Sequence, residues 1–131
     1  MRTIKYTDGA EEQSGVTGYI TSLAEENFKD YLKEYLSEDQ VQAILSWLQE
    51  RKITQFALLR DIWVDYSDRG KGVGTRLLLS FLNEAQGLPV LLINDGLQLQ
   101  QEGFILLSWY QKHGFEVTPF RILSGPILIR F

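Results

Sequence analysis

The stretch from Asp61 to Leu78 constrains the fold of this chain more than any other part of the sequence. It predicts an apolar strand, then a turn with glycine at every second position (Gly70, Gly72 and Gly74), and then an apolar-periodic helix. Glycine permits positive φ angles and lets an anion come close to backbone N–H groups. The first turn of a helix adds N–H groups without intrahelical partners and the positive end of the helix dipole. The stretch therefore predicts a phosphate-binding strand–loop–helix unit.

Two basic residues, Arg69 and Lys71, add positive charge to this turn. The candidate phosphate-binding residues, which we call the glycine loop, are Arg69, Gly70, Lys71, Gly72, Val73, Gly74 and Thr75. A Walker loop requires a Gly-Lys-Ser/Thr triplet, which the sequence lacks. The dinucleotide fingerprint G-x-G-x-x-G, started at Gly70, places Thr75 where its last glycine belongs.

The composition bounds the class of protein. A chain of 131 residues with 44% hydrophobic residues predicts one domain, residues 1–131, with its own core. The sequence contains no cysteine and a single histidine, His113, so we expect no metal site and no cysteine nucleophile. Lack of cysteine and of an apolar leader or membrane segment fits the cytoplasm. A net charge of −4 argues against a general nucleic-acid surface.

The first half of the chain predicts two strands followed by two helices. Arg2 to Tyr6 and Val16 to Leu23 have strand composition. Apolar residues at helical spacing predict a helix through Phe28, Tyr31, Leu32, Tyr35 and Leu36. Ser37 to Gln40 has the form of a capping box and predicts the start of a second helix. The helix pair occupies about residues 24–51.

The second half begins with a predicted strand–helix–strand unit. A strand is expected over Thr54 to Val64, a helix over Gly72 to Gln86, and a strand over Leu88 to Ile93. Gly87 suits the position that follows a helix end. The crossover connection makes the two strands parallel neighbours in one sheet.

The remainder predicts a helix and a hairpin. The helix is expected over Gly103 to Lys112, and the polar segment Leu97 to Glu102 is compatible with its extension. Phe115 to Thr118 leads back into the sheet, and the hairpin joins Arg121 to Ser124 with Ile127 to Phe131. The fold class is α/β, a single domain with a mixed β-sheet flanked by about four helices. Ile127 to Phe131 is apolar on both sides, so as an edge strand it would favour a homodimer.

Two motifs resemble the GNAT N-acetyltransferase superfamily. Residues 69–74 (RGKGVG) match its acyl-CoA signature R-x-x-G-x-G, between an aliphatic strand and a helix. Residues 109–116 (WYQKHGFE) resemble its aromatic-Tyr-x-x-x-Gly-Phe segment. The resemblance covers about residues 56–131. It departs from the family pattern before the Thr54 strand, because only Lys52 to Thr54 separates that strand from the second helix, where the family has a hairpin.

The resemblance implies an acetyl-CoA site. The glycine loop would bind the pyrophosphate, and Ile62, Trp63 and Val64 would pair with the pantetheine amides like an added strand. The cofactor would lie where the Thr54 and Leu88 strands diverge. The Val64 N–H, or its neighbour, would then stabilise the oxyanion.

The resemblance also implies transfer of the acetyl group to a primary amine of a small molecule or a protein, and the absence of cysteine favours direct transfer over a covalent acyl-enzyme. Tyr110 is the candidate acid for the leaving thiolate, with half-buried packing as its alternative role. Asp61 is the candidate base, with an ion pair to a cation such as Arg60 as its alternative. The helix pair would wall the acceptor side. Its acidic residues suit a cationic acceptor, but a solvated helix face explains them more simply.

Two other functions stay open at this point. The chain can be an acyl-CoA-binding regulatory module without turnover, or an effector that acetylates a macromolecule such as aminoacyl-tRNA. The acidic net charge counts against the second of these.

Overall fold

The computed structural model describes residues 2–8, 13–65, 67, 70–93, 100–101, 104–122 and 125–131. Its elements in chain order are β1 (Arg2–Asp8), β2 (Ser14–Ser22), α1 (Glu26–Lys33), α2 (Glu38–Glu50), β3 (Gln55–Trp63), α3 (Val73–Glu84), β4 (Val90–Leu92), β5 (Gln100–Gln101), β6 (Phe104–Ile105), α4 (Leu106–Lys112), β7 (Phe115–Ile122) and β8 (Gly125–Arg130). The α/β class and the mixed sheet with four helices are confirmed for these residues.

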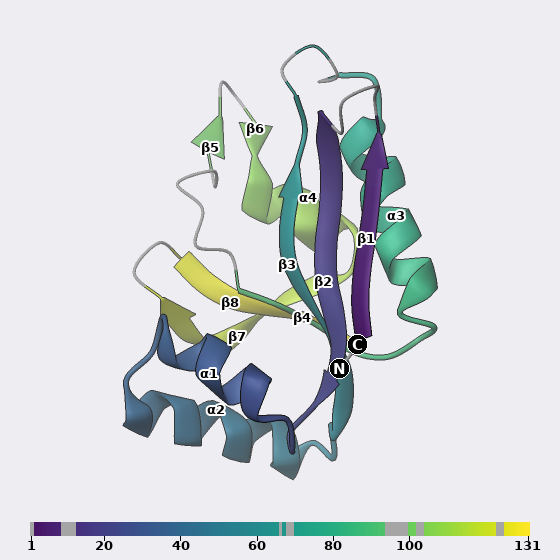
Figure 1. The fold of residues 1–131 in the computed structure, drawn as a ribbon. Coiled ribbons are helices and arrows are strands. Elements are labelled where there is room, and N and C mark those ends of the chain that lie inside the picture. The colour runs from purple at the N-terminus through teal and green to yellow at the C-terminus, as the bar shows by residue number, and fades with distance from the viewer. Residues whose placement is uncertain are drawn as a thin grey trace.

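The main sheet has the strand order β1-β2-β3-β4-β8-β7, and β5 pairs separately with β6. The β3 and β4 strands are parallel, as the crossover through α3 predicts, and the other neighbours in the main sheet are antiparallel. In Figure 1, β1, β2 and the C-terminal part of β3 lie side by side, whereas β4 and β8 extend in a different direction. The sheet therefore opens between β3 and β4.

The helices cover the two faces of the sheet. Leu78 and Phe81 of α3 and Tyr110 of α4 pack with Leu59 of β3 in one buried cluster. On the other face, α1 and α2 pack in a second cluster around Phe56 of β3. Figure 1 shows α1 and α2 side by side at one end of the molecule, and α3 alongside β1. The alternation of buried residues along β3 between the two clusters explains why this strand is apolar on both sides.

The helix pair follows its sequence signals closely. Ser37 accepts a hydrogen bond from the Gln40 backbone N–H at 3.3 Å, and the Gln40 side chain accepts from the Ser37 N–H at 3.1 Å. This is the predicted capping box at the start of α2. Tyr35 and Leu36 lie beyond the end of α1, although both pack on the same cluster as its buried face.

The expected edge strand at the end of the chain is wrong. The β8 strand lies between β4 and β7, and the strands at the edges of the main sheet are β1 and β7. Ile127, Leu128 and Ile129 are at most 3% exposed, because helices cover both faces and strands flank both sides. The two-sided apolar pattern marks a central strand. A homodimer stays a prediction, without this strand as its interface.

The predicted helix over Gly103 to Lys112 is also longer than the one observed. Phe104 and Ile105 form β6, and α4 begins at Leu106. In the segment expected to extend the helix, Gln100 and Gln101 form β5, and the rest lies outside the described residues. Pairing with β5 competes successfully with helix formation here, which periodicity alone does not reveal.

Candidate functional site

The site is built where β3 and β4 separate. Their pairing runs from Ala57↔Val90 to Leu59↔Leu92 and ends there, whereas β3 continues to Trp63. The resemblance to acyl-CoA enzymes predicted this divergence. The part of β3 beyond Leu59 stays in the sheet through β2, since Asp61, Ile62 and Trp63 are in register with Thr17, Val16 and Gly15. The first half of β3 therefore contributes to the core, and its second half contributes to the candidate site.

The glycine loop reaches the first turn of α3 in the predicted conformation. Gly70 and Gly72 have φ angles of +78° and +77°, and Gly72 is the N-cap of α3. A Cβ built on either residue meets no atom within 4 Å, so both glycines face open space. The left-handed backbone explains the need for glycine at both positions. Arg69 lies outside the described residues, and Lys71 is exposed.

The N-terminus of α3 is open, in contrast to that of α2. No side chain caps α3, and its first turn has no acidic residue, whereas α2 has the capping box and Glu38 and Asp39 in its first turn. The first intrahelical bond is Arg76 N–H to the Gly72 carbonyl at 3.1 Å. The N–H groups of Val73, Gly74 and Thr75 precede it. These groups and the open space at Gly70 and Gly72 fit a pyrophosphate.

Gly74 joins the loop to β3 and α4. A Cβ built there would lie 3.2 Å from Val64 Cγ2 and 3.8 Å from Trp109 Cζ2. The two motifs of the sequence, the glycine loop and the aromatic segment, therefore meet at this point. The φ of Gly74 is outside the left-handed region, so backbone conformation does not require glycine there. Glycine is needed instead because a Cβ would crowd the Val64 side chain.

A β-bulge in β3 sets the direction of the two charged residues that follow Leu59. The register passes from Gly18↔Leu59 to Thr17↔Asp61, so Arg60 is an extra residue. Beyond it, Ile62 packs on the cluster with α3, as does its partner Val16. Asp61 therefore lies with Thr17 on the opposite face, the one covered by α1. Without the bulge, Asp61 would point into the apolar cluster.

Arg60 makes its contacts with tyrosines. Its Nη1 donates to the Tyr19 hydroxyl at 2.9 Å, and its guanidinium lies over the Tyr31 ring with Cζ 5.9 Å from the centroid. The bond to Tyr19 is the main cause that raises the pKa of Arg60, and Tyr31 and Tyr35 add smaller contributions. Tyr31 Oη donates a long hydrogen bond of 3.5 Å to the carbonyl of Ile93, which follows β4. Tyr31 thus spans the opening between β3 and β4.

Tyr110 is a core residue on α4 beside the same opening. It is 1% exposed, and its ring lies 5.0 Å from that of Trp109 and 5.4 Å from that of Phe115. Burial raises the pKa of Tyr110 well above its ordinary value, and the nearby charge of Asp61 raises it further. Tyr110 and Asp61 are therefore electrostatic neighbours, although they come from different faces of the sheet. The raised pKa keeps the phenol protonated, and it also makes Tyr110 a weaker acid than an exposed tyrosine.

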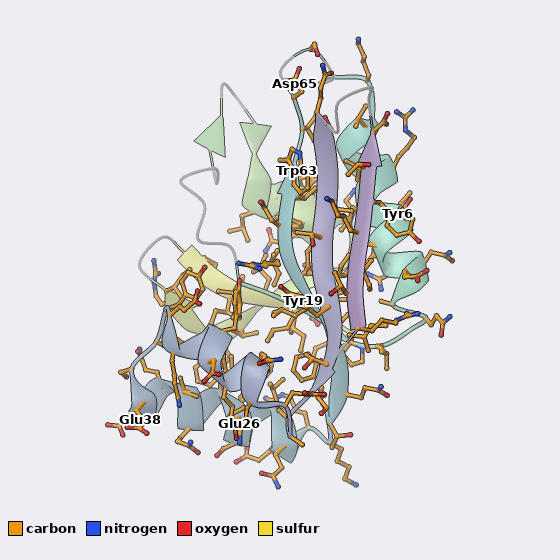
Figure 2. The ribbon with its side chains drawn as sticks, in the orientation of Figure 1. Tyr6, Tyr19, Glu26, Glu38, Trp63 and Asp65 are labelled. Carbon is orange, nitrogen blue, oxygen red and sulfur yellow. The ribbon has the colours of Figure 1, made fainter. Side chains whose placement is uncertain are left out.

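The remaining predicted cofactor residues lie along β3 and the loop. Ile62, Trp63 and Val64 are half-buried, and the Trp63 ring occupies the space that a side chain on Gly15 would fill. Val73 is buried in the core, so only its backbone faces the site. Figure 2 shows Trp63 near the far end of β3 and Asp65 at the loop beyond it.

Sequence reasoning missed the residues that hold the loop in place. The buried Ser14 accepts a hydrogen bond from the Asp65 N–H at 2.8 Å, and Arg76 forms an ion pair of 3.1 Å with Asp8. Both link the hairpin of β1 and β2 to residues on either side of the glycine loop, Asp65 before it and Arg76 after it. No local signal identifies them, because each pair is distant in sequence.

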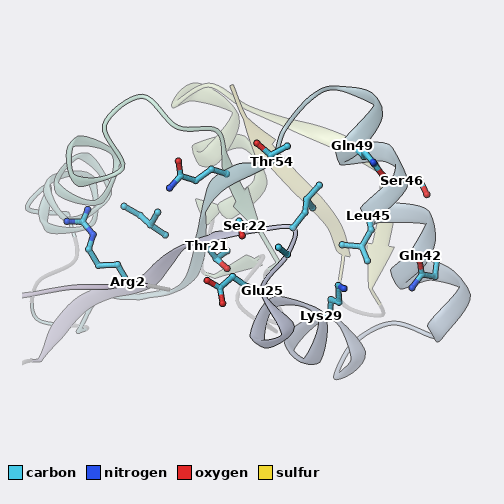
Figure 3. A pocket seen from close by; sticks show the side chains of 14 residues that line it. Arg2, Thr21, Ser22, Glu25, Lys29, Gln42, Leu45, Ser46, Gln49 and Thr54 are labelled. Atoms are coloured by element: carbon cyan, nitrogen blue, oxygen red, sulfur yellow. The ribbon is translucent and has the colours of Figure 1, made fainter.

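A separate hollow of about 850 Å³ lies at the other end of β3, between the start of α1 and the side of α2. Figure 3 shows Thr21, Glu25, Lys29 and Thr54 among its lining residues. Its β3 residue is Gln55, at the start of the strand, so it is distinct from the opening beyond Leu59.

No group of three or more His, Cys, Asp or Glu residues in the described part of the chain is arranged to hold a metal ion. No helix among the described residues has the length and apolarity needed to cross a membrane.

A parallel strand pair that separates, followed by an open glycine loop at a helix N-terminus, defines a fold of the acyl-CoA transferase class. The family model described as the acetyltransferase (GNAT) domain matches residues 10–117. The chain belongs to this family. A search of curated proteins found no match to this sequence.

Solved structures share the fold at low sequence identity. The anti-CRISPR protein AcrVA5 is 14% identical with a TM-score of 0.55, and the alignment covers all of both chains. An acetyltransferase from Bacillus cereus is 18% identical with a TM-score of 0.52, over 98% of this chain and 72% of that one. Naa50 from Arabidopsis thaliana, in complex with the bisubstrate analogue CoA-Ac-MVNAL, is 13% identical with a TM-score of 0.51, over 90% of this chain and 64% of that one.

The order of strands before the site explains the departure from the family pattern. The hairpin of β1 and β2 precedes α1 in the chain, and β2 nonetheless pairs with β3. The connection from α2 to β3 is therefore short, with Ile53 N–H bonded to the Leu48 carbonyl at 3.0 Å.

Proposed function

We propose that the protein is an N-acetyltransferase that moves an acetyl group from acetyl-CoA directly to a primary amine. The proposal rests on one arrangement. The β3 strand continues beyond its pairing with β4, and the loop that follows it leads to the uncapped N-terminus of α3. Membership of the GNAT family supports acyl transfer. The thioester of bound acetyl-CoA would supply the activated acetyl group.

The binding role falls to β3 and the glycine loop. The backbone N–H groups from Arg69 to Thr75 would hold the pyrophosphate, because the loop is open at Gly70 and Gly72. Ile62 to Val64 would bind the pantetheine along the edge of β3 that continues beyond β4. The Val64 N–H, or that of a neighbour, would stabilise the negative charge on the thioester oxygen as the amine attacks.

Asp61 and Tyr110 are the proposed proton-transfer residues. The exposed Asp61 would take a proton from the acceptor ammonium, directly or through water. Tyr110 would give a proton to the leaving thiolate. Its raised pKa keeps that proton in place at neutral pH, but the transfer is less favourable than from a tyrosine with a pKa near 10.

The names of the structural neighbours are compatible with both classes of acceptor, a small-molecule amine and a protein amino group. The name of one, an arylalkylamine N-acetyltransferase like protein from mosquito, refers to a small amine, and its TM-score is 0.56. The ligand of the Naa50 structure joins CoA to a peptide. The acidic residues of the helix pair do not decide between them. Figure 2 shows Glu26 and Glu38 at the end of the molecule away from Asp65.

Calorimetric titration with acetyl-CoA, beside CoA and NADH, tests the cofactor. Micromolar binding of acetyl-CoA with no response to NADH supports the proposal. Release of the CoA thiol in the presence of an amine panel then tests transfer. Absence of acetyl-CoA binding refutes the proposal.

The burial and raised pKa of Tyr110 favour one second candidate, an acyl-CoA-binding module without turnover. In that case acetyl-CoA binds and no amine accelerates release of the thiol. The same two assays therefore separate the two functions.

A further inference from the structure

The bulge in β3 places a positively charged side chain next to the candidate base. Arg60 and Asp61 together oppose the single residue Thr17, on the face of the sheet covered by α1. Both side chains are exposed. They follow directly after Leu59, where pairing with β4 ends. Any acceptor that reaches the opening from this face meets both charges.

Arg60 is held in place without a carboxylate. The Tyr19 hydroxyl accepts from Nη1 at 2.9 Å, and the ring of Tyr31 lies beneath the guanidinium. Among the described residues, the ion pairs of the structure do not include Arg60. Tyr19 packs against the cluster that contains Phe28 and Tyr31 of α1. A guanidinium has five N–H donors, and Tyr19 uses one of them.

The chemistry of this arrangement is that of a carboxylate site. The planar fork of a guanidinium matches a carboxylate in a bidentate pair, and the hydrogen bond to Tyr19 restricts where the Arg60 guanidinium lies. A positive charge at this position would instead repel a second ammonium group on a polyamine. Because Arg60 and Asp61 are consecutive residues at one bulge, we expect the two ends of a matching ligand to be close together.

We propose that Arg60 selects an acceptor that carries a free carboxylate beside its amine, so that the substrate class is amino acids. This rests on the proposed function. The carboxylate pairs with the guanidinium of Arg60, and the amine is directed to Asp61 and the thioester. Arg60 is then the residue that determines specificity for the acceptor.

Matched acceptors test this in the purified protein. The rate of CoA thiol release is measured with free amino acids and with the carboxamides of the same amino acids, each at a pH that holds the fraction of free amine equal. We expect kcat/KM to favour the free acid by at least about tenfold, equivalent to about 1.4 kcal/mol. Arg60→Gln should bring this ratio close to one, and Arg60→Lys should restore only part of it.

Arg51→Gln is the matched control variant. The Arg51 guanidinium also lies over an aromatic ring, 3.8 Å from the centroid of Trp47, but at the end of α2. In Arg51→Gln, the ratio of kcat/KM for the free amino acid to kcat/KM for its carboxamide should equal that of the wild type. The acetyl-CoA dissociation constant and the thermal midpoint of each variant check that the fold is retained.

A binding measurement adds a readout that does not depend on turnover. The Nε–Hε signal of Arg60 in an NMR spectrum, assigned by its loss in Arg60→Lys, should shift on addition of N-acetylglycine and stay in place with N-acetylglycinamide. If acetyl-CoA does not bind but this shift occurs, the proposed function fails and the carboxylate site stands. If acetyl-CoA binds and transfer proceeds equally well to carboxamides, or to polyamines in preference to amino acids, the carboxylate site is refuted.

Discussion

Substituting Gly72 by alanine separates the stability of the glycine loop from its proposed role in binding. Gly72 has a φ of +77° and Gly87, past the other end of α3, has a φ of +81°. A Cβ on either residue meets nothing within 4 Å. The two substitutions therefore impose the same kind of backbone strain, without a steric clash, at opposite ends of one helix.

The expected loss of stability in both variants follows from the backbone conformation. A left-handed conformation costs an L-residue about 1–2 kcal/mol. Reduced freedom of the unfolded chain offsets this by about 0.4–1 kcal/mol. We expect Gly72→Ala and Gly87→Ala each to lower the free energy of unfolding by about 1 kcal/mol, which corresponds to a thermal midpoint lower by about 4 °C.

Binding should distinguish the two variants. The methyl group at position 72 projects into the space proposed for the pyrophosphate, so the acetyl-CoA dissociation constant should rise by at least about tenfold, or about 1.4 kcal/mol. Gly87→Ala should bind as the wild type does. Calorimetric titration and thermal unfolding measure both quantities. Wild-type affinity in Gly72→Ala, or equal losses in the two variants, would contradict the location of the site.

Four other predictions concern the proton-transfer pair and the sheet. Tyr110→Phe should lower kcat by about a hundredfold with little change in acetyl-CoA affinity, and unchanged kinetics would leave Tyr110 with a packing role only. Because burial raises the pKa of Tyr110, the folded protein should lose stability as the pH rises above about 10, where an unfolded tyrosine ionises, and Tyr110→Phe should reduce that loss in urea titrations. Asp61→Asn should lower the pKa of Tyr110, visible as earlier phenolate absorbance, and a pKa that stays in place would refute their coupling. Ile129→Ala, in the central β8, should cost about 2–5 kcal/mol, whereas the 51% exposed Val117 on the edge strand β7 should tolerate alanine with less than about 1 kcal/mol lost; equal effects would contradict the strand order.

Local patterns in the sequence were sufficient for most elements. The capping box at Ser37 started α2 where expected, and the glycines at positions 70 and 72 took up the left-handed backbone that their spacing suggested. These features depend on interactions within a few residues, so the sequence displays them directly. The prediction of parallel β3 and β4 was correct for the same reason, because a short crossover helix leaves few other arrangements.

Long-range pairing decided the rest. The apolar residues of β8 are the same whether the strand lies at an edge or between two neighbours, and only the packing of β4 and β7 on its sides shows that it is central. The length of α4 was overestimated for a local reason instead, since Phe104 and Ile105 pair with Gln101 and Gln100 directly before the helix begins at Leu106.

The sequence by itself determined the GNAT family, the acyl-CoA motif and the identity of the candidate residues, because these lie in contiguous segments with fixed spacing. Only the tertiary structure decided where the charged side chains of Arg60 and Asp61 lie. The extra residue in β3 turns Asp61 away from the apolar cluster, and Tyr19 and Tyr31 hold Arg60 at the opening. A bulge depends on the register between two strands that are distant in the chain, so no local pattern encodes it.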